Sequence, residues 1–262
     1  MSNKPLFNWL DQRGAGVLLH PTCFPGHQGV GTLDYTAFQF LDFLKKAGMT
    51  YWQVCPLGPT GFGDSPYQTF SAFAGNPYLI DLNSLIQAGL LENHDLDPFR
   101  FMPGSRVDFG LLYQHKWPAL HKSFLNFTIG RKQHKALETK FETFKVAQGS
   151  WLDPFALFMA LKQKFEGRCW QDWPEPFSTF HSIQEQHLDQ EILQLAESQK
   201  FFQFLFFEQW TAVKEHANEL GIQIIGDIPI YVAFDSADAW ANPELFQFDE
   251  NSTPLAVAGC PP

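Results

Sequence analysis

The sequence predicts an α/β fold built on a parallel sheet or barrel, with about three strands and a mainly helical segment inserted between the second and the third. Two observations lead to this prediction. A helix, a glycine and a short β-forming apolar run follow one another twice, around Gly48 and again around Gly221. The predicted strands at 50–57 and 222–232 are also much too far apart for one crossover helix, so a large insertion separates them.

The first predicted unit runs β-α-β through the N-terminal part of the chain. Residues 14–21, GAGVLLHP, are a short apolar run that predicts a buried strand. Asp34 is placed to cap the following helix, and two lysines followed by Gly48 mark its end. Residues 50–57, TYWQVCPL, predict the second strand. The apolar side chains of the helix form one stripe, made by Phe38, Phe40, Leu41, Phe43 and Leu44.

The C-terminal part repeats this order after the insertion. A helical pattern through FFEQWTAVKEHANELG ends at Gly221, and the strand 222–232 follows, interrupted by Gly226 and Pro229. Residues 111–209 are mainly helical in pattern, with KWPALHKSFLNF, FALFMALKQKFEG and SIQEQHLDQEILQLAESQK as separate helices. Three parallel strands leave open edges, and the chain ends on AVAGCPP without a capping element. We therefore expect it to be a piece of a longer fold.

Charge and composition argue against several classes of partner. The formal net charge is −10, from 18 Lys and Arg against 28 Asp and Glu, which disfavours binding to nucleic acid or to an anionic membrane surface. Apolar runs such as FFQFLFF at 201–207 are far shorter than the roughly 20 residues that cross a bilayer, and the N-terminal residues do not resemble a signal peptide. We expect a cytoplasmic protein that binds a neutral or cationic ligand.

The cysteines do not indicate a metal site. Cys23, Cys55, Cys169 and Cys260 lie far apart in the sequence, with no C-x-x-C pair and no histidine at ligand spacing. In a reducing compartment, this spacing favours four free thiols over a disulfide framework.

The segment 58–81, GPTGFGDSPYQTFSAFAGNPYLID, directly follows the second predicted strand and is the main candidate for a ligand site. Loops at the carboxyl ends of parallel strands carry such sites, and glycine and proline give this loop tight, stiff turns. Asp64, Ser65, Tyr67 and Gln68 offer hydrogen-bonding groups beside aromatic rings, a combination that suits a sugar. Ordinary packing of the loop's aromatic rings is the alternative. A phosphate loop is disfavoured, because the GK[ST] ending of a P-loop is missing.

Several other residues leave two interpretations open. Asp227 is either a buried carboxylate that accepts backbone N–H groups or a ligand-binding residue at the end of the third strand. His20, at the end of the first strand, is more typical of a structural histidine. No pair of carboxylates in the strand-end loops stands out as the nucleophile and acid of a retaining glycosidase. Core packing is favoured over a sugar platform for the tryptophans Trp52, Trp117, Trp151, Trp170 and Trp173.

Three long motifs, GVLLHPTCFPGHQGVGTL, YWQVCPLGPTGFGDSPYQTFSAFAGNPYLIDL and GDIPIYVAFDSADAWANPELFQFDENSTPLAVAGCPP, resemble the amylomaltases, the 4-α-glucanotransferases of glycoside hydrolase family 77. The resemblance implies a (β/α)₈ barrel with inserted subdomains, of which this chain would hold the N-terminal portion. It also implies a retaining double displacement: an α-1,4 bond is cleaved, the sugar is held as a covalent glycosyl-aspartate, and it is passed to another glucan. The implied substrates are maltooligosaccharides and α-1,4-glucans, without a metal or organic cofactor.

The resemblance further implies site residues. Ser65, Tyr67 and Asp227 match family positions that line the donor sugar site. Phe62 stands where the family often has a tyrosine on a secondary glucan-binding surface. The three essential carboxylates are expected downstream of Pro262, so no catalytic residue is expected in this chain. We therefore expect no transferase activity from the chain alone, and the alternatives are a non-catalytic glucan-binding fragment or a degenerate gene product.

With the resemblance, the chain divides into three predicted parts. Residues 1–110 hold the start of the barrel, with strands one and two and their loops. Residues 111–209 are the mainly helical insertion. Residues 210–262 hold a helix, the third strand and the start of the next inserted subdomain.

Overall fold

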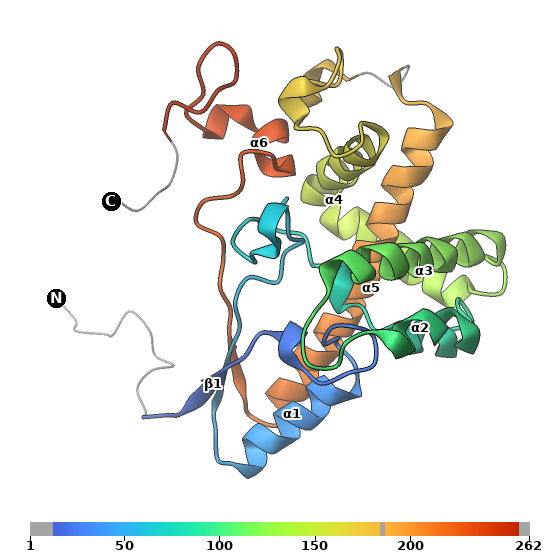
Figure 1. The fold of residues 1–262 in the computed structure, drawn as a ribbon, viewed down its shortest axis with the longest axis vertical. Coiled ribbons are helices and arrows are strands. Elements are labelled where there is room, and N and C mark those ends of the chain that lie inside the picture. Colours follow the sequence, from blue (N-terminus) through green and yellow to red (C-terminus); the bar gives the residue numbers. More distant parts are fainter. Residues whose placement is uncertain (1–12, 184–186, 257–262) are drawn as a thin grey trace.

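The structure, a computed structural model, describes residues 13–183 and 187–256 (Figure 1). Three short parallel strands form one sheet in the order β1-β2-β3, with β1 at Gly16–Leu18, β2 at Tyr51–Gln53 and β3 at Gln223–Ile225. The predicted α/β class and the parallel pairing of the three strands are confirmed.

Each strand is shorter than the sequence predicts. The runs 14–21, 50–57 and 222–232 keep only three paired residues each. A proline follows soon after every strand, and a residue without an N–H cannot extend the hydrogen-bonded ladder. The prediction of a buried strand up to residue 232 is wrong at its far end, because Ile230 is 82% exposed. β1 is not buried either, since Leu18 is 59% exposed at an open edge.

Helix α1, Tyr35–Lys46, begins and ends where the sequence predicts. The Asp34 carboxylate accepts a hydrogen bond from the backbone N–H of Thr36 at 2.8 Å, which satisfies a donor that the first turn leaves free. Gly48 follows the helix with a φ of +73°, a conformation that favours glycine.

The predicted apolar stripe of α1 is confirmed for Leu41 and Leu44, which are fully buried. It is wrong for Phe43, which is 59% exposed. Residues two positions apart in an α-helix are separated by roughly 200° around the helix axis, so Phe43 lies almost opposite Leu41 and faces solvent.

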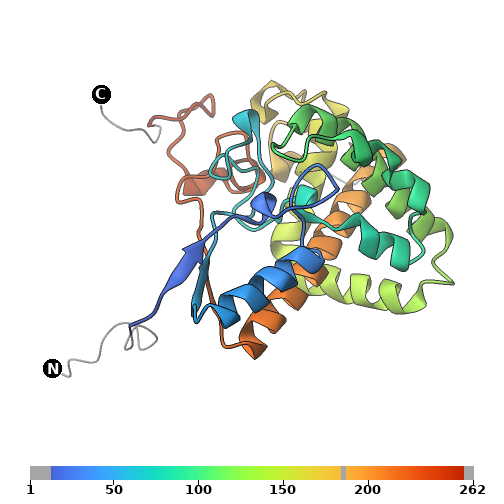
Figure 2. The ribbon, with the colours of Figure 1, turned by 60° about the horizontal axis from the view of Figure 1, so that its bottom comes forward.

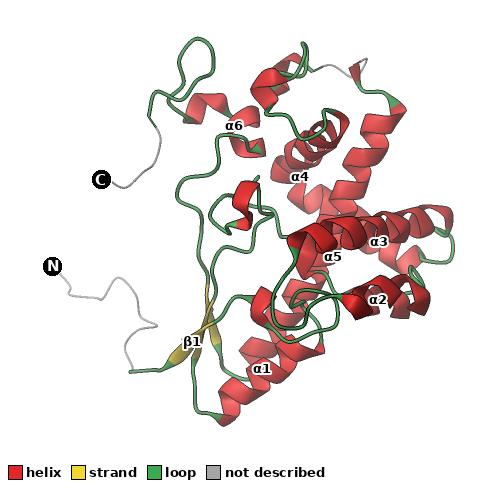
Figure 3. Ribbon diagram, viewed as in Figure 1, coloured by secondary structure: helices red, strands yellow, loops and turns green. Residues whose placement is uncertain are grey.

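The insertion is mainly helical, as predicted (Figure 3). The further α-helices are α2 Leu82–Gln87, α3 Phe109–Ile129, α4 Lys135–Lys164, α5 Gln190–Glu219 and α6 Ala237–Ala241. Short 3₁₀ helices lie at Pro21–Cys23, Phe62–Asp64, Pro77–Leu79, Asn93–Phe101, Trp170–Asp172, Phe180–Ser182 and Pro243–Leu245. Across the described part of the chain, no helix combines the length and apolar character needed to cross a bilayer.

Helix α5 joins two segments that the sequence pattern predicts as separate helices. Residues 190–200, the last part of SIQEQHLDQEILQLAESQK, and the whole of FFEQWTAVKEHANE lie on one uninterrupted helix, because neither glycine nor proline occurs between Gln190 and Glu219. The described residues before it, 182–183 and 187–189, lie outside this helix, so the start of the predicted helix is wrong there. Gly221 follows the helix with a φ of +72°, as predicted. The proposed boundary at residue 209 falls inside α5, and the three-part division of the chain stays a prediction.

Two hydrophobic clusters form the core of the described part of the chain. In the first, α1 and α5 lie side by side on one face of the sheet, where Val17, Trp52 and Ile224 pack against them (Figure 2). The second lies among α4, α6 and the irregular segment before α5, and it buries Trp170 and Trp173. These buried tryptophans have the packing role that the sequence favours. The opposite face of the sheet is largely exposed, and among the described residues β1 and β3 pair with β2 alone.

Candidate functional site

The loop 58–81, which follows β2, is held in one shape by its own contacts. The Gly61 N–H donates to the carbonyl oxygen of Gln68 at 2.8 Å. A Cβ atom at Gly58 would meet the hydroxyl oxygen of Thr69 at 2.4 Å, so this position requires glycine. Specific contacts therefore hold the loop in place, in agreement with the stiff loop that the sequence predicts.

Two glutamines of α5 fasten this loop to the helix. The Gln203 side chain accepts from the Gly75 N–H at 2.7 Å and donates to the Gly75 carbonyl oxygen at 2.9 Å. The Gln209 side chain accepts from the Asp81 N–H at 2.8 Å. A Cβ atom at Gly75 would lie 2.0 Å from the ring of Phe206. These glutamines were not predicted from the sequence, although amides within the phenylalanine-rich run FFQFLFFEQW indicate buried groups with partners.

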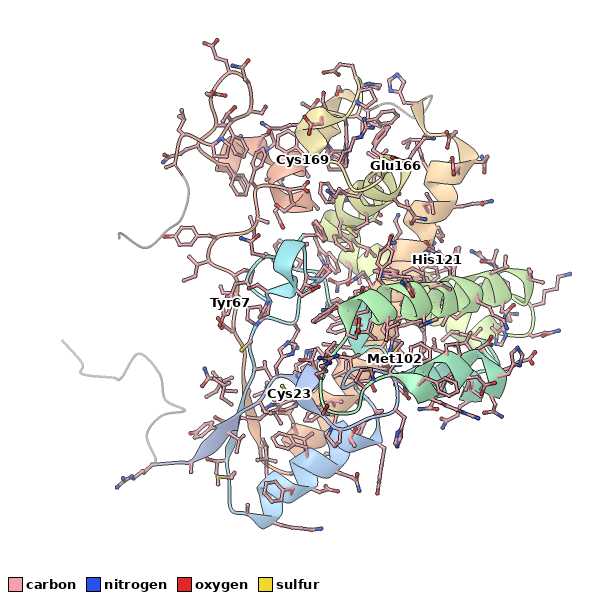
Figure 4. The ribbon with its side chains drawn as sticks, in the orientation of Figure 1. Cys23, Tyr67, Met102, His121, Glu166 and Cys169 are labelled. Carbon is pink, nitrogen blue, oxygen red and sulfur yellow. The ribbon has the colours of Figure 1, made fainter. Side chains whose placement is uncertain are left out.

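A hydrogen bond joins the loop after β2 to the segment after β3. The Tyr67 hydroxyl donates to Oδ2 of Asp227 at 2.8 Å, although the two residues are 160 positions apart. Tyr67 is half-exposed and lies where the loop after β2 passes the segment after β3 (Figure 4). The Ser65 hydroxyl lies beside it and accepts from the Tyr67 backbone N–H at 3.3 Å. The structure thus brings together Ser65, Tyr67 and Asp227.

The contact with Asp227 raises the pKa of Tyr67 to about 12, because the carboxylate accepts the phenolic proton in a hydrogen bond. The hydroxyl therefore stays neutral near pH 7 and remains a donor. Asp227 is exposed, so it is not the buried carboxylate that the sequence left open as one interpretation. Its second oxygen, Oδ1, accepts no hydrogen bond from the described residues and is free to accept one from a ligand.

The two residues of this pair line two neighbouring cavities. Asp227 and Cys55 line a cavity of about 220 Å³, and Tyr67 lines a larger one of about 1090 Å³. Phe73 and Pro229 border both cavities. The site therefore combines a free carboxylate oxygen and a phenol with apolar walls, which suits a neutral ligand rich in hydroxyl groups.

The other polar residues named from the sequence differ in their surroundings. Gln68 lines the larger cavity, whereas Asp64 lies in the short helix Phe62–Asp64, where burial raises the pKa of its carboxyl group. His20 has protein partners at both ring nitrogens, the Thr22 hydroxyl at 2.7 Å and the Pro56 carbonyl oxygen at 3.3 Å. Burial lowers the pKa of His20. These contacts are those of a structural histidine, as the sequence favours.

The backbone of Phe62 is described, but the placement of its side chain is not. A third cavity, of about 880 Å³, lies beside the same loop and is lined by Thr60, Tyr113 and Trp117 among others. The Gln199 side chain also lines it, and its buried Oε1 atom accepts no hydrogen bond from the described residues. The assignment of Phe62 to a secondary glucan surface stays a prediction.

The described residues contain no group of three or more His, Cys, Asp or Glu side chains arranged to hold a metal ion. Cys23, Cys55 and Cys169 are free thiols in the structure. Cys260 lies outside the described residues.

Comparisons with known proteins identify the family of the chain. Residues 19–262 match the family model of glycoside hydrolase 77, described as 4-alpha-glucanotransferase. The chain belongs to this family. The 4-alpha-glucanotransferase of Thermus thermophilus is 50% identical over 253 residues, covering 95% of this chain and 49% of the relative. That of Clostridium butyricum is 42% identical, covering 93% of this chain and 49% of the relative. The resemblance found in the sequence is thereby confirmed.

Solved structures of two amylomaltases share the fold. The amylomaltase from Streptococcus agalactiae in complex with acarbose aligns with a TM-score of 0.86 at 38% identity, covering 95% of this chain and half of that one. The amylomaltase from Corynebacterium glutamicum aligns with a TM-score of 0.66 at 18% identity, which supports the fold alone. The chain spans about half the length of the curated relatives it matches.

Proposed function

We propose that this chain forms the N-terminal part of a cytoplasmic 4-α-glucanotransferase, which transfers α-1,4-glucan segments between maltooligosaccharides by a retaining double displacement. Family membership over most of the chain supports the reaction class, and the half-length match to the relatives supports the partial extent. The observation that carries the proposal is the hydrogen bond between Tyr67 and Asp227, which builds one polar wall from the loops after two neighbouring strands.

This wall suits the donor sugar of a glucan. Oδ1 of Asp227 accepts from a sugar hydroxyl, while Tyr67 holds Oδ2 and so fixes the orientation of the carboxylate. The Ser65 hydroxyl adds a second polar group next to the Tyr67 ring. The amylomaltase from Streptococcus agalactiae was solved in complex with acarbose, which supports a carbohydrate ligand for this chain as well.

The wall does not by itself perform the transfer. A retaining mechanism needs a nucleophile and an acid/base carboxylate about 5 to 5.5 Å apart. Asp227 engages a tyrosine instead of a second carboxylate, so we assign it to binding. We propose that the catalytic carboxylates follow residue 262 and that the chain alone is inactive.

Incubation of the chain with maltotriose tests this assignment. We expect neither glucose nor longer maltooligosaccharides, because no residue supplies the covalent intermediate. Steady formation of both products would contradict the proposal and place a nucleophile within these 262 residues.

Calorimetric titration with maltoheptaose tests the binding role. We expect the wild-type chain to release heat and Asp227→Ala to weaken binding at least about tenfold, since hydrogen bonds to charged groups contribute about 1.5–3 kcal/mol. Asp97→Ala, at an exposed carboxylate that pairs with Arg100, is the matched control and should bind as the wild type does. A flat wild-type titration would refute glucan binding by this chain, and it would favour a degenerate gene product over the non-catalytic glucan-binding fragment.

We also propose that Phe62 marks a secondary glucan-binding surface. Two observations support a ligand site beside this loop: the cavity that Tyr113 lines, and the Gln199 amide oxygen, which accepts no hydrogen bond from the described residues. Phe62→Ala should then weaken binding of maltoheptaose while the contribution of Asp227 persists. If Phe62→Ala binds maltoheptaose as tightly as the wild type does, Phe62 is not part of a glucan-binding surface.

A further inference from the structure

The cavity of about 1090 Å³ extends well beyond Tyr67. Its walls come from the loop after β2, from α4 around Trp151, and from the segment between β3 and α6, which passes close to that loop (Figure 1). Pockets of roughly 300–1,000 Å³ enclose a whole drug-sized ligand, so this one has room for more than a single sugar unit.

An aromatic platform lies on one wall of this cavity. The ring of Phe73 stacks on that of Trp151, with centroids 6.3 Å apart and planes inclined by 19°. Trp151 in turn packs on Phe155 and Phe207, and its indole N–H donates to the Gln148 side chain at 2.8 Å. Trp151 is therefore fixed from behind, while Phe73 remains 59% exposed.

The backbone holds Phe73 in this exposed position. The Phe73 and Ala74 N–H groups both point to the Ser71 hydroxyl oxygen, at 3.1 and 3.3 Å. The Ala72 N–H donates to the Asp238 carboxylate at 2.9 Å, which ties the loop to α6. A bulky apolar ring kept at a cavity wall by three such contacts presents a preformed apolar surface, and preformed surfaces lower the entropic cost of binding.

The rest of the cavity supplies the groups that a sugar needs around such a ring. Ile230 and Tyr231, largely exposed, form an apolar wall, while Gln68, Asp238 and Asn242 offer hydrogen-bonding groups. A pyranose has an apolar face and a polar rim, so it fits an aromatic surface with polar groups at its edges.

Building on the proposed function, we propose that Phe73 and Trp151 form a distal glucan subsite. This subsite binds a glucose unit further along the chain than the unit held by Tyr67 and Asp227. Glucans long enough to reach both places gain contact with the platform, whereas maltose occupies only one of them. Phe73 is therefore a residue that sets the preference for long over short glucans.

Titration of the 262-residue chain with maltose, maltotriose and maltoheptaose tests the proposal. We expect the wild type to bind maltoheptaose more tightly than maltose. Phe73→Ala should weaken maltoheptaose binding between about two- and tenfold, the range of one aromatic contact, and should weaken maltose binding less, because maltose does not reach both places. Phe73→Tyr, which keeps a ring, should restore the wild-type affinity.

Phe101→Ala is the matched control, because Phe101 is 87% exposed in the 3₁₀ helix Asn93–Phe101 and lines none of the three cavities described above. Unchanged maltoheptaose binding by Phe73→Ala, or an equal loss for maltose and maltoheptaose, would overturn the distal subsite. If Asp227→Ala still weakens the binding of all three glucans in that case, the proposed function stands without the subsite. If the wild type binds no glucan, both proposals fail.

Discussion

Tyr67 and Asp227 lie 160 positions apart, yet their side chains share a hydrogen bond of 2.8 Å at the exposed end of the sheet. The sequence suggested each residue separately, Tyr67 from its loop and Asp227 from its strand. Their direct contact was not predictable from local patterns, because it depends on β2 and β3 being neighbours in the sheet.

The titration of Tyr67 tests this contact. The carboxylate stabilises the protonated phenol, which raises the pKa of Tyr67 to about 12, so Asp227→Asn should bring the pKa down toward the ordinary value of about 10. Nuclear magnetic resonance of the chain labelled at the tyrosine ring carbons measures this pKa. Identical titration curves for Tyr67 in the two proteins would show that the hydrogen bond does not form in solution.

Gly75 is a second residue whose role is set by a distant partner, because a Cβ atom there would lie 2.0 Å from the Phe206 ring. We expect Gly75→Ala to lower the free energy of unfolding by about 1–3 kcal/mol, the usual cost of overpacking. Gly104→Ala is the matched control, since a Cβ at Gly104 meets no atom within 4 Å. Urea denaturation measures both values, and equal stabilities of the two variants would contradict the tight contact between loop and helix.

Among the elements, helix α3 contributes a buried lysine that binds it to the loops of the sheet. The Lys116 ammonium donates to the Ile80 carbonyl oxygen at 2.6 Å and to the Gln28 amide oxygen at 3.2 Å. Burial lowers the pKa of Lys116 to about 7, although the carboxylates of Asp81 and Asp34 oppose this shift. A neutral amine still has two N–H groups, so it keeps both hydrogen bonds.

The pH dependence of stability tests the state of Lys116. Between pH 7 and the unfolded pKa of about 10.4, the unfolded chain binds more protons than the folded one, so stability should rise with pH in this window. Lys116 changes the free energy of unfolding by at most about 1.4 kcal/mol per pH unit in this window. Below pH 7 the lysine is protonated in both states, so it adds no further pH dependence. Lys116→Met should remove this contribution, so urea denaturation at pH 7 and pH 9 should show a smaller rise for the variant. Equal rises for the two proteins would contradict a lowered pKa.

The sequence predicted elements well where a local signal marks them. The cap at Asp34 placed the start of α1 correctly, and the glycines at 48 and 221 placed the ends of α1 and α5. The prediction from sequence was wrong for α5, because the change from a polar to a phenylalanine-rich composition suggested two separate helices. That change reflects a helix that passes from the surface into the core, while its backbone has no residue that would interrupt it.

The sequence predicted which residues form the candidate site better than it predicted how they are arranged. Ser65, Tyr67 and Asp227 were named from motifs, and the structure places them together. Gln203 and Gln209, which hold the loop on α5, and the Phe73–Trp151 platform were not identified, because their roles depend on packing between segments far apart in the sequence.

At the scale of the whole molecule, helices cover one face of the sheet, and the other face and both strand edges are open among the described residues. Exposed apolar side chains lie beside these edges, namely Leu18, Ile228, Ile230 and Tyr231. Unpaired strand edges and apolar surface favour association with another chain or segment.

We therefore expect the isolated chain to associate at rising concentration, as measured by sedimentation velocity. Replacing Ile228 and Ile230 together by lysine should shift the chain toward the monomer, because charge opposes edge pairing. Ile129→Lys, at an exposed position on α3, should leave association unchanged. A compact monomer at every concentration would show that the open sheet is stable without a partner.

We propose above that the Tyr67–Asp227 pair forms one wall of a glucan-binding site. A crystal structure of this chain with maltoheptaose tests it most directly. We expect a glucose unit with a hydroxyl group within hydrogen-bonding distance of the Asp227 carboxylate and its ring next to Tyr67. Maltoheptaose ordered only elsewhere on the molecule, with no sugar in contact with either residue, would contradict it.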